Sequence, residues 1–210
     1  NQNYAQLMAV CDLDSNRAAE GKTLVNDFYS KRDGKPFDGV KVYTDYRELL
    51  LNKDIDAVLI STPDHTHAMI GAAAARAGKH IYMQKPASLT IAEGRIISNV
   101  VQKSGVKFQI GSQQRSTEQF RYAAELVRNG RIGKLKTVYV GLPGDPPGGK
   151  TDEIKKKKNL NYDMWLASTP EIYYTEDRVH PQVGYGRPGW LRCEQFGAGM
   201  ITGWGAHHID

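Results

Sequence analysis

The first 111 residues alternate four times between short apolar runs and stretches with helix signals, and this rhythm most constrains the fold. Each strand-and-helix unit spans about 20 to 30 residues. Because crossovers between parallel strands are right-handed, such a series builds a parallel sheet with helices on both faces. The sequence therefore predicts a doubly wound α/β domain over residues 1–114.

The strands of this domain are expected in apolar runs that turn signals interrupt. The predicted strands cover residues 6–13, 41–43, 55–61, 80–83 and 106–110. The predicted helices cover residues 15–31, 46–51, 68–77 and 90–103. Ser15 and Thr90 are expected to cap helices, because a hydroxyl can accept a hydrogen bond from a free backbone N–H of the first turn. Gly78 and Gly105 stand where helices end.

The rhythm changes after Gly111, which indicates a second domain over residues 115–210, part of an α+β substrate domain. A helix is predicted over 117–129 and a strand over 135–142, where apolar and polar residues alternate. A Pro/Gly/Lys-rich loop follows at 143–158. Aromatic residues then crowd the last fifty positions.

Composition excludes several classes of protein. Hydrophobic residues make up 40% and charged residues 24%, as in ordinary globular proteins, and no run of 18 apolar residues is present. No membrane partner is therefore expected. The net charge of +5 depends on the lysines at 155–158, a solvated loop without aromatic or Arg partners, so no nucleic acid is expected. Cys11 and Cys193 are too far apart in sequence to suggest a metal site, and no metal is expected.

Asp12 follows the first predicted strand. In a doubly wound sheet, ligands lie beyond the carboxyl ends of the strands, and an acid at this position accepts hydrogen bonds from the ribose of a dinucleotide. Its charge would repel a 2′-phosphate, which favours NAD over NADP. A solvated acid in a turn is the open alternative. The glycine-rich loop expected about 20 residues earlier is not in the sequence, so we expect an incomplete chain that lacks the first strand.

Lys85 lies between a predicted strand and Pro86. Proline disfavours helical backbone in its predecessor, so Lys85 is expected to be extended and to point outward at the sheet's carboxyl edge. An ammonium there can hydrogen-bond a substrate hydroxyl and favour its deprotonation. An ordinary surface lysine is the alternative. For His67, at a helix start, a capping or packing role is the default expectation.

His207 and Asp210 are three positions apart and would share one face of a helix. Histidine suits a base that takes the proton of an alcohol as the carbon is oxidised, because its pKa lies near neutrality. An acid on the same face could orient the imidazole. Two neighbouring histidines that simply pack between domains are the alternative.

Four segments together resemble one family in order and spacing. They are A-V-C-D at 9–12, D-A-V-L-I-S-T-P-D-H-T-H at 56–67, A-G-K-H-I-Y-M-Q-K-P at 77–86 and G-R-I-G-K-L at 130–135. This pattern is similar to the glucose-fructose oxidoreductase/inositol dehydrogenase (Gfo/Idh/MocA) family, over essentially the whole chain. The resemblance implies an NAD(P)-dependent oxidoreductase that oxidises a secondary hydroxyl of a sugar, a cyclitol or a sugar derivative, with NADP the less expected cofactor.

The resemblance also implies roles for individual residues. Lys85 and His207 would be catalytic, and the Lys85–Pro86 bond is expected to be cis. The expected cofactor-binding residues are Asp12, Thr62, Pro63, His67, Gln84 and Lys85. The expected substrate-binding residues are Arg115, Trp190, Arg192 and His208, with Tyr162, Trp165 and His180 as further candidates, several of which must instead be core. A homo-oligomer is expected of the whole protein.

Two positions depart from the family pattern. Gln84 stands where the family usually has Glu, and Gly203 stands where an Asp usually precedes the catalytic histidine by four residues. These departures leave two alternatives open: a glycoside-cleaving enzyme that retains NAD through transient oxidation and elimination, and a non-catalytic ligand-binding protein on the same scaffold. The compartment stays open, because some relatives carry a twin-arginine export signal.

Overall fold

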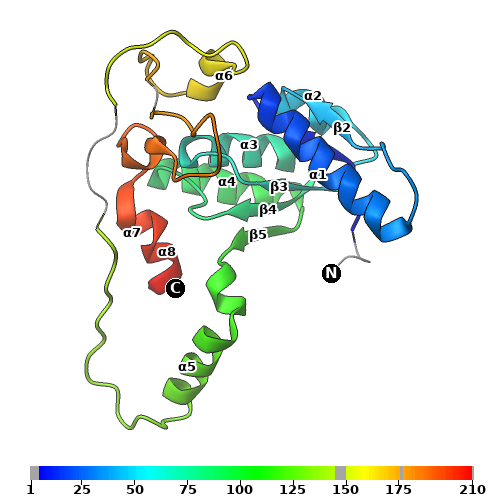
Figure 1. Cartoon of the computed structure of the whole chain (residues 1–210). Helices are drawn as coiled ribbons and strands as arrows, with labels where there is room; N and C mark the ends of the chain where they lie inside the picture. The colour runs from blue at the N-terminus through cyan, green and yellow to red at the C-terminus, as the bar shows by residue number, and fades with distance from the viewer. Residues whose placement is uncertain (1–4, 145–149, 176, 210) are drawn as a thin grey trace.

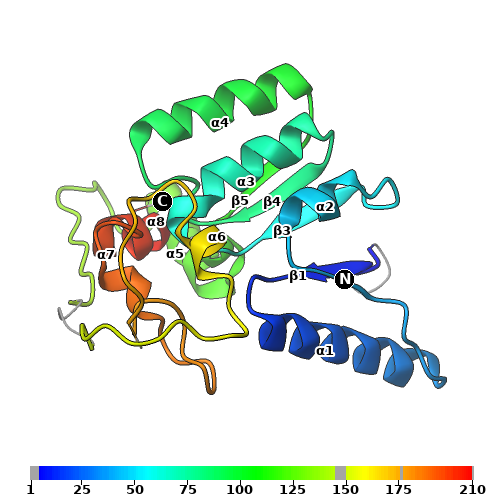
Figure 2. The ribbon, with the colours of Figure 1, turned by 90° about the horizontal axis from the view of Figure 1, so that it is seen from above.

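The computed structural model describes residues 5–144, 150–175 and 177–209. Figure 1 shows a layered α/β body built by the first half of the chain, with helix α5 projecting away from it. Seen from above, α3 and α4 cover one face of the strands and α1 covers the opposite face (Figure 2). This arrangement confirms the predicted doubly wound fold.

All five predicted strands form, and every strand pair is parallel. Strands β1 (Ala9–Cys11) and β2 (Lys41–Tyr43) make one pair. Strands β3 (Ala57–Ile60), β4 (His80–Gln84) and β5 (Phe108–Gly111) make a second sheet in that order. Within the described chain, no hydrogen-bonded ladder joins β1 to β3. Several predicted site residues follow the carboxyl ends of strands in both sheets.

Helix α1 (Ser15–Asp33) begins one residue earlier than its predicted cap implies. Asp14, not Ser15, is the N-cap, and its carboxylate accepts a 2.9 Å hydrogen bond from the Asn16 N–H. The prediction for Ser15 is therefore wrong. A carboxylate also stabilises a helix N-terminus through the helix dipole, which a neutral hydroxyl does less well.

The remaining helices of the first half follow their local signals. Helix α2 covers Tyr46–Leu51. In α4 (Ile91–Ser104), Thr90 and Glu93 form a capping box, which confirms Thr90 as the cap. Helix α3 (Asp64–Arg76) starts four residues before its predicted first residue, because Pro63 already has the extended backbone of an N-cap. The polar residues in the first turn of α3 are buried. They therefore belong to the helix and not to a loop before it.

The core of the first half lies between the second sheet and helices α3 and α4. Ala74 and Met83 are fully buried, and Ile60, Ile81 and Ile97 are nearly so. Small residues on α3 let it lie close to β4 and α4. This packing fixes the carboxyl ends of β3 and β4 relative to one another.

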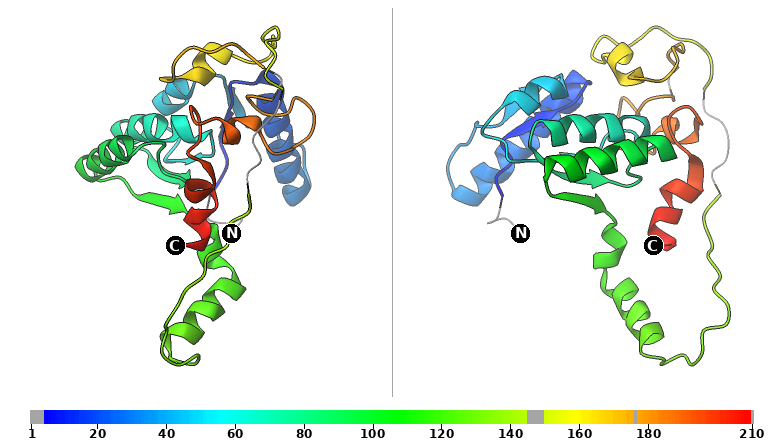
Figure 3. Two further views of the ribbon diagram at one scale, coloured as in Figure 1. Left: turned by 90° about the vertical axis from the view of Figure 1, so that its left-hand side faces the viewer. Right: turned by 180° about the vertical axis from the view of Figure 1, so that it is seen from behind.

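The second half consists of short helices and irregular segments. They are the 3₁₀ turns η1 (Gln113–Ser116) and η2 (Gly189–Arg192), and the helices α5 (Glu118–Arg128), α6 (Tyr162–Leu166), α7 (Gly199–Gly203) and α8 (Gly205–His208). The helix predicted at 117–129 is confirmed as α5. None of its residues is buried, so its apolar face is largely uncovered in the described chain. Figure 3 shows α5 standing clear of the body from two further sides.

The strand predicted over residues 135–142 is wrong. These residues carry no strand pairing, and Tyr139 is 92% exposed. An alternating pattern forms a strand only when a neighbouring strand accepts its backbone hydrogen bonds, and the described part of the chain supplies none there. The α+β architecture of the second half and the domain boundary at residue 114 stay predictions.

An aromatic core between residues 160 and 196 packs against α3. Tyr162, Trp165, Tyr174 and Phe196 are buried together. His65 of α3 lies 5.0 Å, ring centre to ring centre, from both Trp165 and Phe196, and its Nε2 atom is 2.8 Å from the Trp165 carbonyl oxygen. Four of the eight crowded Trp, Tyr and Phe residues are therefore structural.

The described chain contains no helix long and apolar enough to cross a membrane. Within the same residues, no group of three or more His, Cys, Asp or Glu side chains is arranged to bind a metal ion.

Candidate functional site

A cavity of about 520 Å³ lies at the carboxyl ends of β1 and β3. Both halves of the chain line it. Four of its lining residues are predicted site residues, namely Asp12, Thr62, Pro63 and Trp190, and Trp165 and His180 also reach it. The structure therefore brings together residues that the sequence places up to 178 positions apart.

Asp12 stands directly after β1, where its N–H donates to the Tyr43 carbonyl oxygen at 3.2 Å. Its carboxylate accepts a 2.9 Å hydrogen bond from the Asp14 N–H. Burial raises the pKa of Asp12 above its ordinary value, and the Asp14 N–H and His180 act in the opposite direction. A carboxylate at this edge of the sheet is the group expected to meet ribose hydroxyls.

Asp14 connects the two halves beside the cavity. Its carboxylate accepts a 2.7 Å hydrogen bond from the Asn159 side chain and lies 2.7 Å from His180 Nε2. Burial alone would raise its pKa, but the hydrogen bonds from Asn159, His180 and Asn16 outweigh burial and lower it. Sequence analysis missed this residue, although an acid just before a helical stretch is a recognisable cap signal.

Arg17 holds the segment that covers the cavity. Its guanidinium donates hydrogen bonds to the carbonyl oxygens of Pro181 at 2.9 Å and Gly184 at 2.6 Å, and lies 4.6 Å from the ring centre of Tyr185. Arg17 also lines the cavity. Sequence analysis missed it too, because its partners lie more than 160 residues away.

Lys85 lies beside the C-terminal helices. Its Nζ donates a 2.9 Å hydrogen bond to the carbonyl oxygen of Gly203, the last residue of α7, and α8 with His207 follows directly. The predicted cis Lys85–Pro86 bond is confirmed. Burial lowers the pKa of Lys85, and Arg187 adds to this effect, whereas Asp64 opposes it. The predicted catalytic lysine and the helix of the predicted catalytic histidine are thus adjacent.

The two residues predicted to flank Lys85 in the cofactor cleft serve the loop after β4. Gln84 Oε1 accepts a 3.0 Å hydrogen bond from the Lys85 N–H. His67 is 1% exposed, and its Nδ1 lies 2.5 Å from the Pro86 carbonyl oxygen. Burial lowers the pKa of His67. Neither residue lines the cavity, so the packing role that a helix-start histidine suggests fits His67.

Three of the predicted substrate residues lie away from the cavity. Arg115 is in η1, and Arg192 is exposed in η2. His208 is exposed, stacks on Trp204 at 5.8 Å between ring centres and lies 6.1 Å from Phe120. Their substrate-binding roles stay predictions.

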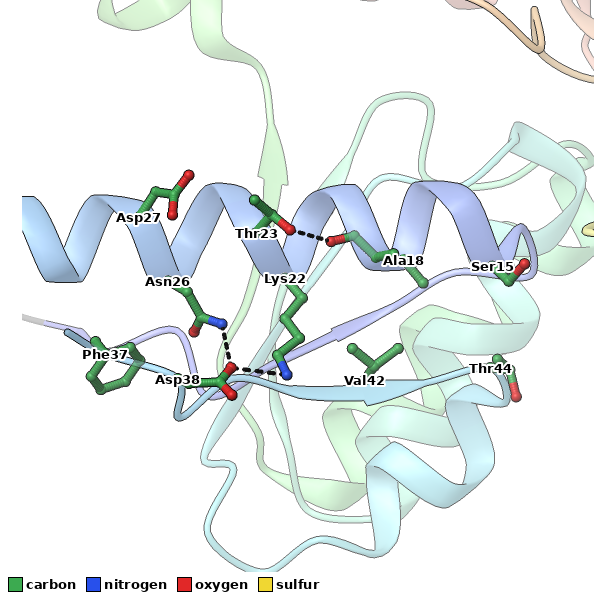
Figure 4. Close-up of a pocket in the computed structure, with 11 residues that line it drawn as sticks. Ser15, Ala18, Lys22, Thr23, Asn26, Asp27, Phe37, Asp38, Val42 and Thr44 are labelled. Carbon is green, nitrogen blue, oxygen red and sulfur yellow. Dashed lines mark hydrogen bonds and ion pairs between the residues drawn. The ribbon is translucent and has the colours of Figure 1, made fainter.

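A second cavity of about 500 Å³ lies between α1 and β2. Figure 4 shows Lys22 and Asn26 pointing from α1 toward Asp38, to which they are joined at 2.9 Å and 2.8 Å. None of the predicted site residues lines this groove. The cavity at the carboxyl ends of β1 and β3 is therefore the better candidate for a cofactor.

Comparison with known proteins decides the family. A model of the Gfo/Idh/MocA oxidoreductase family, described as having an NAD-binding Rossmann fold, matches residues 1–112. The chain belongs to this family. Among Gfo/Idh/MocA proteins, the chain is 34% identical over 123 residues to the uncharacterized oxidoreductase YrbE of Bacillus subtilis, which covers 59% of the chain and 36% of that protein. It is 32% identical over 126 residues to a myo-inositol 2-dehydrogenase of Thermotoga maritima, covering 60% of the chain and 37% of that protein.

Solved Gfo/Idh/MocA structures share the fold. The myo-inositol 2-dehydrogenase of Lactobacillus plantarum matches with a TM-score of 0.54 and 29% identity, over 63% of this chain and 36% of that one. The scyllo-inositol dehydrogenase of Lactobacillus casei with bound NAD(H) and scyllo-inositol matches with a TM-score of 0.50 and 31% identity, over 62% and 35%. The chain thus spans little more than a third of the length of these relatives.

Proposed function

We propose that the protein containing this chain is an NAD-dependent dehydrogenase that oxidises a secondary hydroxyl of a sugar, a cyclitol or a sugar derivative. The observation that carries the proposal is the 2.9 Å hydrogen bond from Lys85 Nζ to the Gly203 carbonyl oxygen. It joins the end of β4 to the helices that carry His207. Relatives named as inositol and levoglucosan dehydrogenases support the substrate class.

The cavity beside Asp12 fits the adenosine end of a dinucleotide. The Asp12 carboxylate would accept hydrogen bonds from the ribose hydroxyls, and its charge would disfavour a 2′-phosphate. Ser61 and Thr62 line the same cavity after β3, and the Thr62 hydroxyl oxygen already accepts a 2.7 Å hydrogen bond from the Thr66 hydroxyl. Acceptors and hydroxyls therefore face the cavity from two strand ends.

The chemistry of the reaction divides between the cofactor and two side chains. Bound NAD would supply the acceptor for the hydride that leaves the alcohol carbon. The Lys85 ammonium would donate a hydrogen bond to the substrate hydroxyl and stabilise the charge that builds on its oxygen. The His207 imidazole would take the hydroxyl proton, since a neutral histidine is a suitable base near neutral pH. Burial of Lys85 strengthens its attraction for a developing negative charge.

The test is the substitution Lys85→Met in the whole protein, assayed with a panel of cyclitols and sugars. We expect turnover to fall by about 10²–10⁴-fold, the usual contribution of a positioned acid or base, while NAD binding by calorimetric titration is retained. Lys103→Met, on the exposed last turn of α4, is the matched control and should leave turnover unchanged. Unchanged turnover in Lys85→Met would overturn the proposal.

The same assay separates the alternatives. Release of a leaving group from a glycoside without net NADH formation would show a glycosidase that retains its cofactor. NAD binding without turnover of any compound on the panel would show a ligand-binding protein on this scaffold.

A further inference from the structure

Asp64 and Lys85 lie at the same edge of the second sheet. Strands β3 and β4 are neighbours, with Ile60 opposite Met83, so the segments that follow them leave the sheet side by side. Asp64 is the first residue of α3, after β3, and is 5% exposed. Lys85 comes directly after β4.

The second half of the chain closes over both residues. A Cβ atom placed on Gly197 would lie 3.6 Å from Asp64 Oδ2, and Gly203, six residues later, accepts the Lys85 hydrogen bond. The segment from Gly197 to Gly203 therefore lies against both the buried Asp64 and the half-buried Lys85, and residues 195–209 carry no acidic side chain. An enclosed charge is screened less by solvent than an exposed one.

The positions that usually supply a carboxylate near this lysine are neutral here. Gln84 carries an amide, whose oxygen accepts the Lys85 N–H, and Gly203 offers only its backbone carbonyl. In the described chain, no carboxylate lies within 4.0 Å of Lys85 Nζ. Two charged groups act on the Lys85 ammonium: Asp64 attracts it and Arg187 repels it. The Lys85 charge also acts on the neighbouring His67.

We propose that the Asp64 carboxylate is the positioning partner that keeps Lys85 in its ammonium form and directs it toward the substrate hydroxyl. The proposal deepens the proposed function and rests on it. Asp64 thereby supplies the negative charge that positions 84 and 203 lack. It acts through Lys85 and touches no reacting atom itself.

The protonation behaviour of Asp64 gives the pair a dependence on pH. Burial raises the pKa of Asp64 to about 7, and Lys85 works against this rise. Above pH 7 the carboxylate is mostly ionised and stabilises the ammonium. Below pH 7 it is mostly neutral, so Lys85 loses its counter-charge while Arg187 continues to repel it.

The experiment measures the reactivity of the Lys85 amine in the folded whole protein without substrate. A trace amine-acylating reagent labels lysines in competition over pH 6–10, and mass spectrometry reads the labelling at each site. We expect Asp64→Asn to lower the Lys85 pKa, which increases its labelling at pH 8 about 3–10-fold, since one pKa unit is a tenfold change. Asp64→Glu keeps the charge and should return labelling toward the wild-type level. Asp27→Asn, on the exposed face of α1, removes one charge elsewhere and should change nothing.

A second variant tests the proposal if Asp64→Asn does not fold. In Lys85→Gln, the Asp64 pKa, read from its carboxyl ¹³C shift, should rise, because the attractive ammonium is gone. Unchanged Lys85 labelling in folded Asp64→Asn, or an unchanged Asp64 pKa in Lys85→Gln, overturns the proposal. Neither readout needs turnover, so failure of the dehydrogenase assignment, seen as full activity in Lys85→Met, is a separate result.

In an active enzyme the same variant should separate chemistry from binding. We expect Asp64→Asn to lower kcat more than it changes KM and to move the acidic limb of the kcat profile. A change in KM alone, with an unaltered pH profile, would show a structural role and contradict the proposal.

Discussion

The Nε2 atom of His180 lies 2.7 Å from an Asp14 carboxylate oxygen, across 166 residues of sequence. Asp14 is at the same time the N-cap of α1 and the acceptor of a hydrogen bond from Asn159. One buried carboxylate therefore fixes the start of a helix and the segment that covers the cavity. Loss of this carboxylate should loosen both.

We expect Asp14→Ala to lower the free energy of unfolding by about 2–4 kcal/mol, because it removes a cap and leaves the half-buried donors of Asn159 and His180 unpaired. Asp45→Ala is the matched control. Asp45 also caps a helix, α2, but its other partner is the exposed Arg47, so the loss should be about 1 kcal/mol. Urea unfolding followed by circular dichroism measures both. Equal losses would show that the contacts of Asp14 with the second half contribute nothing.

The pKa of Asp64 predicts how stability depends on pH. A carboxyl group whose pKa is raised in the folded state stabilises the fold fully below its unfolded pKa near 3.8 and loses that contribution as pH rises through the folded value of about 7. The contribution of Asp64 to stability should therefore fall between pH 4 and 8 by an amount on the order of 2–4 kcal/mol. Asp64→Asn, which cannot ionise, should abolish this fall and be more stable than wild type at pH 8. An unchanged slope in this variant would contradict the raised pKa.

The features that sequence analysis predicted correctly are those that short segments encode. The strand-helix rhythm and the Thr90 cap each depend on residues within a few positions of one another, and the cis Lys85–Pro86 bond was predicted from the family resemblance. The position of Asp12 after a parallel strand and the family resemblance for Thr62 and Pro63 pointed to residues that line one cavity, and their cofactor roles stay predictions. Family resemblance then pointed to Lys85 and His207.

The features that it missed depend on partners far away in the sequence. Residues 135–142 have a strand pattern but no neighbouring strand in the described chain, so the pattern stays unpaired. Asp64 lies between the predicted strand at 55–61 and the predicted helix at 68–77, and only the placement of Gly197 shows that its carboxylate is covered. The role of Arg17 likewise rests on carbonyl groups of residues 181 and 184.

Asp12 provides a test of the cofactor preference. We expect Asp12→Asn to weaken NAD binding to the whole protein about 10–100-fold, because a hydrogen bond to a charged group contributes about 1.5–3 kcal/mol. Binding of NADP should weaken less or improve, because the repulsion of its 2′-phosphate is removed. Calorimetric titration with both cofactors measures the ratio. If the two affinities fall by the same factor, Asp12 does not lie at the ribose.

Gly71 tests the packing that sets the distance between the ends of β3 and β4. A Cβ atom there would overlap with Met83 Cε and lie 2.6 Å from Ile97 Cδ1. We expect Gly71→Ala to lower the free energy of unfolding by about 1–3 kcal/mol, since α3 must shift or both side chains must leave their rotamers. Gly21→Ala in α1 is the control, because its Cβ would meet Val10 at an ordinary 3.4 Å. It should stabilise by about 0.4–1 kcal/mol through the better helix propensity of alanine.

A double variant shows whether the overlap causes the loss. Ile97→Val removes the Cδ1 atom and by itself should cost about 0.5–1.5 kcal/mol. In Gly71→Ala/Ile97→Val the new methyl group occupies part of the space that Cδ1 leaves, so the combined loss should be smaller than the sum of the two single losses. Thermal and urea unfolding of the four proteins give the coupling energy. Strictly additive losses would mean that contact with Ile97 Cδ1 does not cause the loss of stability in Gly71→Ala. The absence of a side chain at position 71 would then not explain why α3 lies close to β4 and α4.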